Sequence, residues 1–143
     1  MPRRPLDIEV ADLAQALGLL VRRVRAESGA HELSLTESAV LARLDREGPA
    51  TTADLARAER MRPQSMGTTI AALEELGCVV RKPHPTDGRQ VHIALTAKGA
   101  ALRQGAREAR RSWLAQAVTT LDDAERDTVF AAGRIMRRLA DSQ

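Results

Sequence analysis

The chain has 143 residues, and 22 lysines and arginines against 19 aspartates and glutamates leave a net charge of only +3. This length suits one compact domain with appended helices. A single cysteine excludes a disulfide framework and a thiolate zinc cluster, and an aromatic content of 1% argues against binders of single-stranded nucleic acid that stack bases. No apolar run approaches the ~18 residues of a membrane helix, and the N-terminus lacks the apolar stretch of a signal peptide. We therefore expect a cytoplasmic protein that does not enter the membrane.

The first predicted helix carries an apolar seam with the spacing of a coiled coil. Its apolar residues recur in steps of three and four, and Ser28–Ala30 ends the helix. The members of this seam are Val10, Leu13, Leu17, Leu20 and Val24.

Three shorter helices are predicted in the middle of the chain. The first begins after an N-cap at Thr36 and ends at Gly48-Pro49. The second follows an N-cap at Thr52, and the third is delimited by Pro63 at its first position and Gly77 after its end. The residues expected to face the core from these helices are Val40, Leu41, Leu44, Leu55, Met66, Ile70, Leu73 and Leu76.

After these helices the hydrophobic period changes from that of a helix to that of a strand. Residues 78–82 form a short apolar and basic run, and residues 83–88 have the composition of a turn. Residues 91–95 alternate in polarity, which predicts a second strand and hence a β-hairpin over 78–95. The buried face of this second strand should consist of Val91, Ile93 and Leu95.

Two helices are predicted at the C-terminal end. Thr96 caps a long helix that runs to about residue 118, and Asp122 with Glu125 resembles a capping box for a last helix. That last helix has an apolar seam of its own, and a seam without a partner inside its chain usually packs against a second chain. We therefore expect a homodimer whose interface includes Val10, Leu13, Leu17, Leu20, Val129, Met136 and Leu139.

Residues 52–77 have the form of a helix-turn-helix, in which the second helix enters the major groove of DNA. The early polar residues of helix 63–76 are small or carry an amide, and these side chains suit base edges and phosphates. At the hairpin tip, Arg89 suits a narrow minor groove, and we expect Asp87 to orient it. The candidate DNA-binding residues are Arg62, Pro63, Gln64, Ser65, Thr68, Thr69, Arg81, Lys82, Asp87 and Arg89.

A series of short motifs runs from the short helix to the end of the hairpin. The most specific is Asp87-Gly88-Arg89 followed by Leu95-Thr96-Ala97-Lys98-Gly99, and it comes after Leu55-Ala56, Pro63–Met66 and Leu73–Gly77. With these motifs the chain resembles the MarR family of winged helix-turn-helix regulators.

The resemblance implies a mainly α fold with a small β-hairpin wing (α+β), in which a winged helix-turn-helix is flanked by dimerisation helices. We expect an N-terminal dimerisation helix in residues 1–34, the DNA-binding domain in 35–95 and C-terminal dimerisation helices in 96–143. The resemblance also implies a homodimer on a pseudo-palindromic operator in double-stranded DNA, with helix 63–76 in the major groove and the wing 83–90 at the minor groove. Repression is the commoner mode in the family and activation stays open; a small molecule or an oxidant often releases the DNA.

No motif identifies an effector. His31 and Trp113 are candidates to border a ligand pocket, with packing as the alternative for Trp113. Cys78 lies beside two valines, so we expect a buried apolar role, and the lack of tyrosine separates the chain from the family's peroxide sensors. The histidines, with His84 and His92 on the hairpin, lack metal-ligand spacing, so we expect solvated or phosphate-facing rings, no metal and no cofactor.

Two other classes of function are alternatives. A hydrolase could use Ser65 and the histidines, but the sequence contains no nucleophile elbow, phosphate loop or paired-carboxylate arrangement. An adaptor with the same fold would place Ser65, Gly67 and Thr68 against a protein partner. A steep loss of affinity with salt distinguishes a DNA-binding regulator from both.

Overall fold

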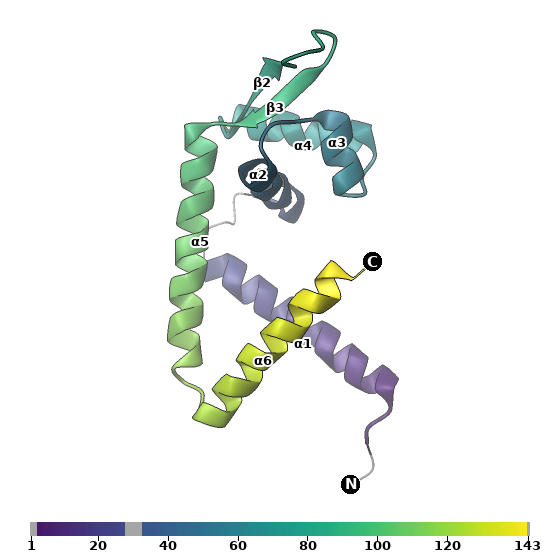
Figure 1. The fold of residues 1–143 in the computed structure, drawn as a ribbon. Helices are drawn as coiled ribbons and strands as arrows, with labels where there is room; N and C mark the ends of the chain where they lie inside the picture. The colour runs from purple at the N-terminus through teal and green to yellow at the C-terminus, as the bar shows by residue number, and fades with distance from the viewer. Residues whose placement is uncertain (1–2, 28–32, 143) are drawn as a thin grey trace.

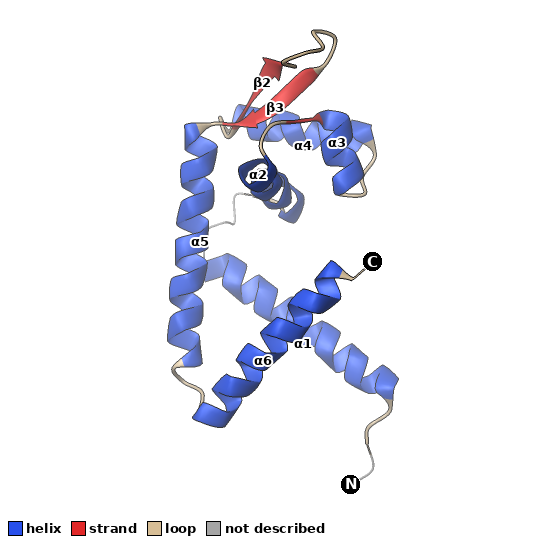
Figure 2. Ribbon diagram, in the orientation of Figure 1, coloured by secondary structure: helices blue, strands red, loops and turns tan. Residues whose placement is uncertain are grey.

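The computed structural model describes residues 3–27 and 33–142. Figures 1 and 2 show a long helix, α5, that runs from a small sheet at its N-terminal end to α6 at its C-terminal end. The predicted mainly helical fold with a β-hairpin is confirmed. In chain order the elements are α1 (Leu6–Glu27), α2 (Leu35–Glu47), β1 (Ala50–Thr51), α3 (Thr52–Ala58), α4 (Pro63–Glu75), β2 (Val79–Pro83), β3 (Val91–Leu95), α5 (Ala97–Val118) and α6 (Asp123–Asp141).

The sheet of the described residues is antiparallel, with the strand order β1-β3-β2. In the hairpin, Val79 pairs with Leu95 and Pro83 pairs with Val91, so the loop of the wing comprises residues 84–90. The predicted turn over residues 83–88 begins one residue too early, because Pro83 is the last residue of β2. The sequence did not predict β1, because its two residues are too few to show a period of alternation.

The core lies where α2, α3, α4 and the sheet meet. The predicted inward residues of the three helices are buried with one exception, Leu76, which is 36% exposed because α4 ends at Glu75 and the chain turns away. On β3, the expected alternation is wrong at two positions, since Val91 is exposed and Ala94 is buried. The buried apolar residues are Leu33, Val40, Leu41, Leu44, Leu55, Ala56, Met66, Ile70, Leu73, Cys78, Val79, Ile93 and Ala94.

Side-chain caps set the beginnings of most helices. The predicted caps at Thr96 and Asp122 are confirmed. For α2 the prediction was wrong: the N-cap is Ser34, which forms a capping box with Glu37. For α3 the N-cap is Thr51, whose hydroxyl accepts from the backbone N–H of Asp54. In both cases a neighbouring Ser or Thr, which caps equally well, takes the position.

α5 begins against the end of the helix-turn-helix. The hydroxyl of Thr96 donates to the carbonyl of Gly77 at 2.6 Å, and its backbone N–H donates to the carbonyl of Cys78 at 3.0 Å. Gly99, one turn into α5, is buried where a side chain would overlap the carbonyl oxygen of Cys78. The absence of a Cβ at Gly99 therefore permits this junction between the wing and α5.

α1 and α6 contain no buried residue, although they have 22 and 19 residues respectively. α1 contacts α5, where the guanidinium of Arg23 lies 5.9 Å from the ring centroid of Trp113. The apolar seam of α1 nevertheless stays open to solvent, with exposed fractions between 37% and 55% at Val10, Leu13, Leu17 and Leu20.

Candidate nucleic-acid interface

The helix-turn-helix is formed by α3 and α4, which pack through apolar side chains. Leu55 of α3 and Met66 and Ile70 of α4 are completely shielded from solvent. The connecting residues 59–62 include Arg60 with a φ of 54°, the left-handed region that only a few per cent of non-glycine residues adopt. The turn is therefore tight. The orientation of α4 is held by the packing of its buried face against α3 and by the turn at its N-terminal end.

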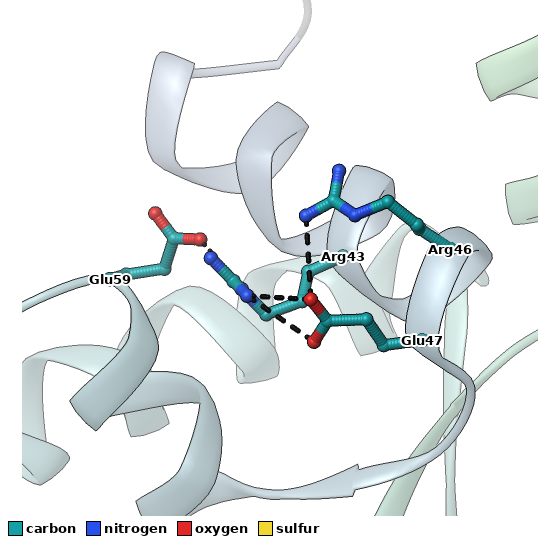
Figure 3. A network of polar contacts seen from close by, with 4 residues as sticks. All are labelled: Arg43, Arg46, Glu47 and Glu59. Carbon is teal, nitrogen blue, oxygen red and sulfur yellow. Dashed lines mark hydrogen bonds and ion pairs between the residues drawn. The ribbon is translucent and has the colours of Figure 1, made fainter. Parts of the chain in front are cut away.

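A network of ion pairs ties this turn to α2 (Figure 3). Arg43 of α2 donates from Nε to Glu59 at 3.0 Å and from Nη1 to Glu47 at 3.0 Å, while Arg46 lies 3.6 Å from Glu47. The hydrogen bond to Glu59 raises the pKa of the Arg43 guanidinium, so it is charged throughout the physiological range. Sequence reasoning missed this network, because Arg43 lies in α2 and Glu59 in the connection after α3, and no local spacing connects them.

The N-terminal half of α4 presents a polar face to solvent. The hydroxyls of Thr68 and Thr69 donate to the carbonyls of Gln64 and Ser65, each at 3.3 Å, which leaves their lone pairs free to accept. The first turn of α4 contains no acidic residue, and no side chain caps it. Among the sequence-predicted residues here, Thr69 is half-buried, and those that are exposed are Arg62, Pro63, Gln64, Ser65 and Thr68.

The tip of the wing is held by hydrogen bonds between its own residues. Oδ1 of Asp87 accepts from the backbone N–H of Arg89 at 3.0 Å, and the backbone carbonyl of Asp87 accepts from Gln90 at 3.1 Å. Asp87 therefore positions Arg89 through the backbone N–H of that residue. Within the described part of the chain the Arg89 guanidinium makes no ion pair, and its side chain is exposed.

A histidine stabilises the same turn, which sequence reasoning missed. Nδ1 of His84 accepts from the backbone N–H of Thr86 at 3.2 Å and from that of Asp87 at 3.1 Å. The ring also packs edge-on against His92 of β3, with centroids 4.3 Å apart. The only signal in the sequence was the turn composition of residues 85–88, because the side chains that typically close turns on their own backbone are those of Asn, Asp, Ser and Thr.

The basic residues near the interface differ in their availability. Arg81 of β2 pairs with Glu74 of α4 at 3.2 Å, and Arg57 of α3 pairs with Asp54 at 3.2 Å. Lys82, beside Arg81, has an exposed side chain. The structure thus joins the C-terminal end of α4 to the strand that leads into the wing, and it gives Arg81 an acidic neighbour that sequence spacing did not predict.

The remaining candidates contribute less to this interface. His31 lies outside the described residues. Trp113 is half-buried beneath Arg23, far along α5 from the wing. Cys78 is buried as predicted. Over residues 3–27 and 33–142 no cluster of three or more His, Cys, Asp or Glu side chains has the arrangement of a metal site.

Comparison with known proteins assigns the family. The model of the MarR family matches residues 33–91, which span α2 to the start of β3. The chain is 41% identical over 131 residues to an HTH-type transcriptional regulator of Mycobacterium bovis, an alignment that covers 92% of each protein. The chain belongs to the MarR family. As a member, it is a transcriptional regulator, in a family whose regulators bind DNA, act as dimers and are not enzymes.

Two further relatives of this MarR-family regulator extend the comparison. An HTH-type transcriptional repressor of Mycobacterium bovis is 33% identical over 101 residues, which cover 70% of this chain and 73% of that protein. A crystal structure of a Pseudomonas aeruginosa transcriptional regulator superposes with a TM-score of 0.86 at 32% identity, covering 99% of this chain and 100% of the other. None of the described helices is both long and apolar enough to span a membrane.

Proposed function

We propose that this MarR-family regulator is a homodimeric repressor that binds a pseudo-palindromic operator. In each protomer α4 lies in the major groove and the wing 83–90 reaches the adjacent minor groove. The observation that carries the proposal is the polar, acid-free and exposed N-terminal half of α4, together with a wing whose tip holds Arg89. A helix-turn-helix recognition helix contacts base edges with this same half.

The chemistry of the two elements supports separate roles in recognition. The amide of Gln64 pairs with the N6 and N7 edge of adenine, and the hydroxyls of Ser65 and Thr68 suit bases or phosphates. Arg89 carries a full charge at a protruding turn, which matches the strongly negative potential of a narrow minor groove. Arg62, Lys82 and the backbone of the wing then serve as phosphate contacts, which fix the register on the duplex.

The proposal of a dimer is supported by α1 and α6, the two helices in which no residue is buried within the protomer. Seven apolar residues of α1 and α6 form the proposed interface, and their exposed fractions range from 36% to 64%. Complete burial of an exposed side chain of this kind contributes about 1.5–3 kcal/mol; because these side chains are already partly covered, each contributes roughly half of that in the interface. The interface residues are Val10, Leu13, Leu17, Leu20, Val129, Met136 and Leu139, and residues 1–34 and 96–143 serve dimerisation.

A repressive role with ligand-controlled release is the remaining part of the proposal. The 33% identical relative named as a repressor supports repression. We place an anionic effector at a pocket between α2 and α5 that Ser38, Leu102 and Arg110 line in part; its volume is about 30 Å³, so an effector has to widen it by separating the two helices. Arg103 also lines this pocket, and its buried Nε lies 3.4 Å from the carboxylate of Asp45 without forming a hydrogen bond. Burial lowers the pKa of the Arg103 guanidinium. The carboxylate of a ligand would therefore stabilise its charged form.

Selection of bound fragments from genomic DNA tests the proposal. We expect enrichment of one sequence with inverted half-sites, whose centres lie about 10–10.5 base pairs or a multiple of this apart. Overlap of the site with a promoter would support repression, and a position upstream of the promoter elements would indicate activation. Recovery of fragments without a common sequence would contradict the operator proposal.

A further inference from the structure

The imidazole of His84 acts as a hydrogen-bond acceptor inside the loop of the wing. Its Nδ1 lies 3.2 Å from the backbone nitrogen of Thr86, 3.1 Å from that of Asp87 and 3.3 Å from the hydroxyl of Thr86. Both backbone groups can only donate, so Nδ1 carries no proton and the neutral ring holds its proton on Nε2. In the imidazolium form both ring nitrogens donate, and these two hydrogen bonds are lost.

Two further hydrogen bonds connect this acceptor to the tip of the wing. The backbone N–H of Asp87 is held by His84, and Oδ1 of Asp87 accepts from the backbone N–H of Arg89 at 3.0 Å. The loop is closed where His84 donates from its backbone to the carbonyl of Gln90 at 3.1 Å. Loss of the contacts at Nδ1 therefore frees the segment that positions Arg89.

We propose that His84 is a positioning residue of the wing, and that only its neutral form holds Arg89 in the geometry that binds DNA. This proposal rests on the proposed DNA-binding role of the wing. Because the imidazolium form cannot accept a hydrogen bond at Nδ1, protonation of His84 lowers DNA affinity. An imidazole that merely faces phosphates has the opposite effect, because its protonation adds a cation beside the DNA.

The ring and charged side chains of the wing and of its base determine which controls are needed. From β3, the ring of His92 packs against the ring of His84 at an interplanar angle of 62°. Lys82 of β2 is the register partner of His92. From α3, the Asp54–Arg57 ion pair lines an open pocket at the base of the wing, and Asp87 lies in the loop itself.

Two substitutions of His84 separate its acceptor role from its charge. In His84→Asn the side-chain oxygen takes the place of Nδ1, accepts from the same amides and does not titrate, and asparagine suits such turns. His84→Ala removes the acceptor at every pH. His92→Asn is the matched control, because it removes the neighbouring titratable ring and leaves the contacts at Nδ1 in place.

Affinity for the duplex recovered by the genomic selection is measured at about pH 8 and about pH 5.5 at constant ionic strength. We expect the wild type to bind at least about fivefold more weakly at the lower pH, the lower limit of the factor that corresponds to two ordinary hydrogen bonds. His84→Asn should bind equally at both values, His92→Asn should retain the loss, and His84→Ala should bind weakly at both. Equal pH profiles of the wild type and His84→Asn, or tighter wild-type binding at low pH, would overturn the proposal.

The ring tautomer provides a second readout that does not require DNA. Nitrogen NMR of the free protein at about pH 8 should place the His84 proton on Nε2, and a proton on Nδ1 would overturn the positioning role. A wild type without sequence-specific binding at either pH contradicts the proposed function of the wing. The tautomer then still decides whether His84 holds the loop.

Discussion

The carboxylate of Glu74, near the C-terminal end of α4, lies 3.2 Å from Nε of Arg81 on β2. Their side chains are 43% and 44% exposed, so the pair is accessible from solvent. The contact joins the proposed recognition helix to the strand that leads into the wing. Because Glu74 competes with phosphates for the guanidinium, the pair restrains one of the basic residues nearest the proposed interface.

The substitution Glu74→Gln should therefore increase DNA affinity. The exposed pair is worth only about 0.2–1 kcal/mol, so we expect a gain of about twofold to fivefold at low salt. If Arg81 then contacts a phosphate, the slope of log affinity against log salt becomes steeper by about 0.9. Fluorescence anisotropy over a salt series measures both quantities. The matched control is Glu75→Gln, and equal effects of the two variants would show that only net charge matters.

Replacement of Arg89 tests the wing. Arg89→Ala should weaken operator binding by roughly 1–3 kcal/mol, because it removes the charge that we place in the minor groove. Arg111→Ala removes an exposed arginine far along α5, so its affinity should stay within about twofold of the wild type. Gel-shift titrations compare the two variants. Equal affinities for Arg89→Ala and Arg111→Ala would contradict the assignment of the wing.

Gln64 should determine base preference and not overall affinity. Its exposed amide lies in the first turn of α4, where a recognition helix meets base edges. In Gln64→Ala we expect relaxed preference at one position of each half-site, with a discrimination loss of about 1–3 kcal/mol there. Binding to a library of single-base operator variants measures this. A uniform loss across the library would indicate a contact to the DNA backbone instead.

Gly99 should be the most sensitive glycine of α5. In Gly99→Ala the new methyl group would overlap the carbonyl of Cys78 and lie 2.8 Å from Cδ1 of Leu95, so we expect a loss of at least about 2 kcal/mol of unfolding free energy. Gly105→Ala places its methyl group in open space on the same helix and should stabilise by about 0.5–1 kcal/mol. Urea unfolding at one protomer concentration measures both. A loss at Gly105 equal to that at Gly99 would contradict the steric account.

The dimer interface can be tested by placing a charge in the seam of α1. Leu17→Glu should raise the dimer dissociation constant at least about 100-fold, because a symmetric interface would then bury two carboxylates without partners. Gln15→Glu adds the same charge to α1 about half a helical turn away from the seam. Sedimentation at micromolar concentration should show a monomer for the first variant and a dimer for the second. A wild-type monomer would contradict the proposed interface.

Local sequence signals predicted much of this fold but little of what connects its parts. Pro63, Thr96 and the Asp122–Glu125 box mark helix boundaries because capping depends on neighbouring residues alone. The contact between Glu74 and Arg81 depends on how the hairpin packs against α4, which no spacing in the sequence encodes.

The same limit applies within the candidate site. Motif and polarity placed Gln64 and Arg89 at exposed positions, as the structure has them. The direction of the Asp87 carboxylate, toward the backbone N–H of Arg89, follows from the conformation of the loop. Nδ1 of His84 accepts two hydrogen bonds from the backbone of this loop. From the sequence alone we expected only a solvated or phosphate-facing role for this ring.

The central claim is that this MarR-family protein binds one DNA sequence in preference to others. The most direct test is a salt titration of the wild type with the selected duplex and with a scrambled duplex of the same composition. We predict an affinity for the selected duplex at least ~10³-fold higher at physiological salt, and a steep decline of both affinities as salt increases. Equal affinities for the two duplexes, or binding that does not change with salt, would contradict the claim.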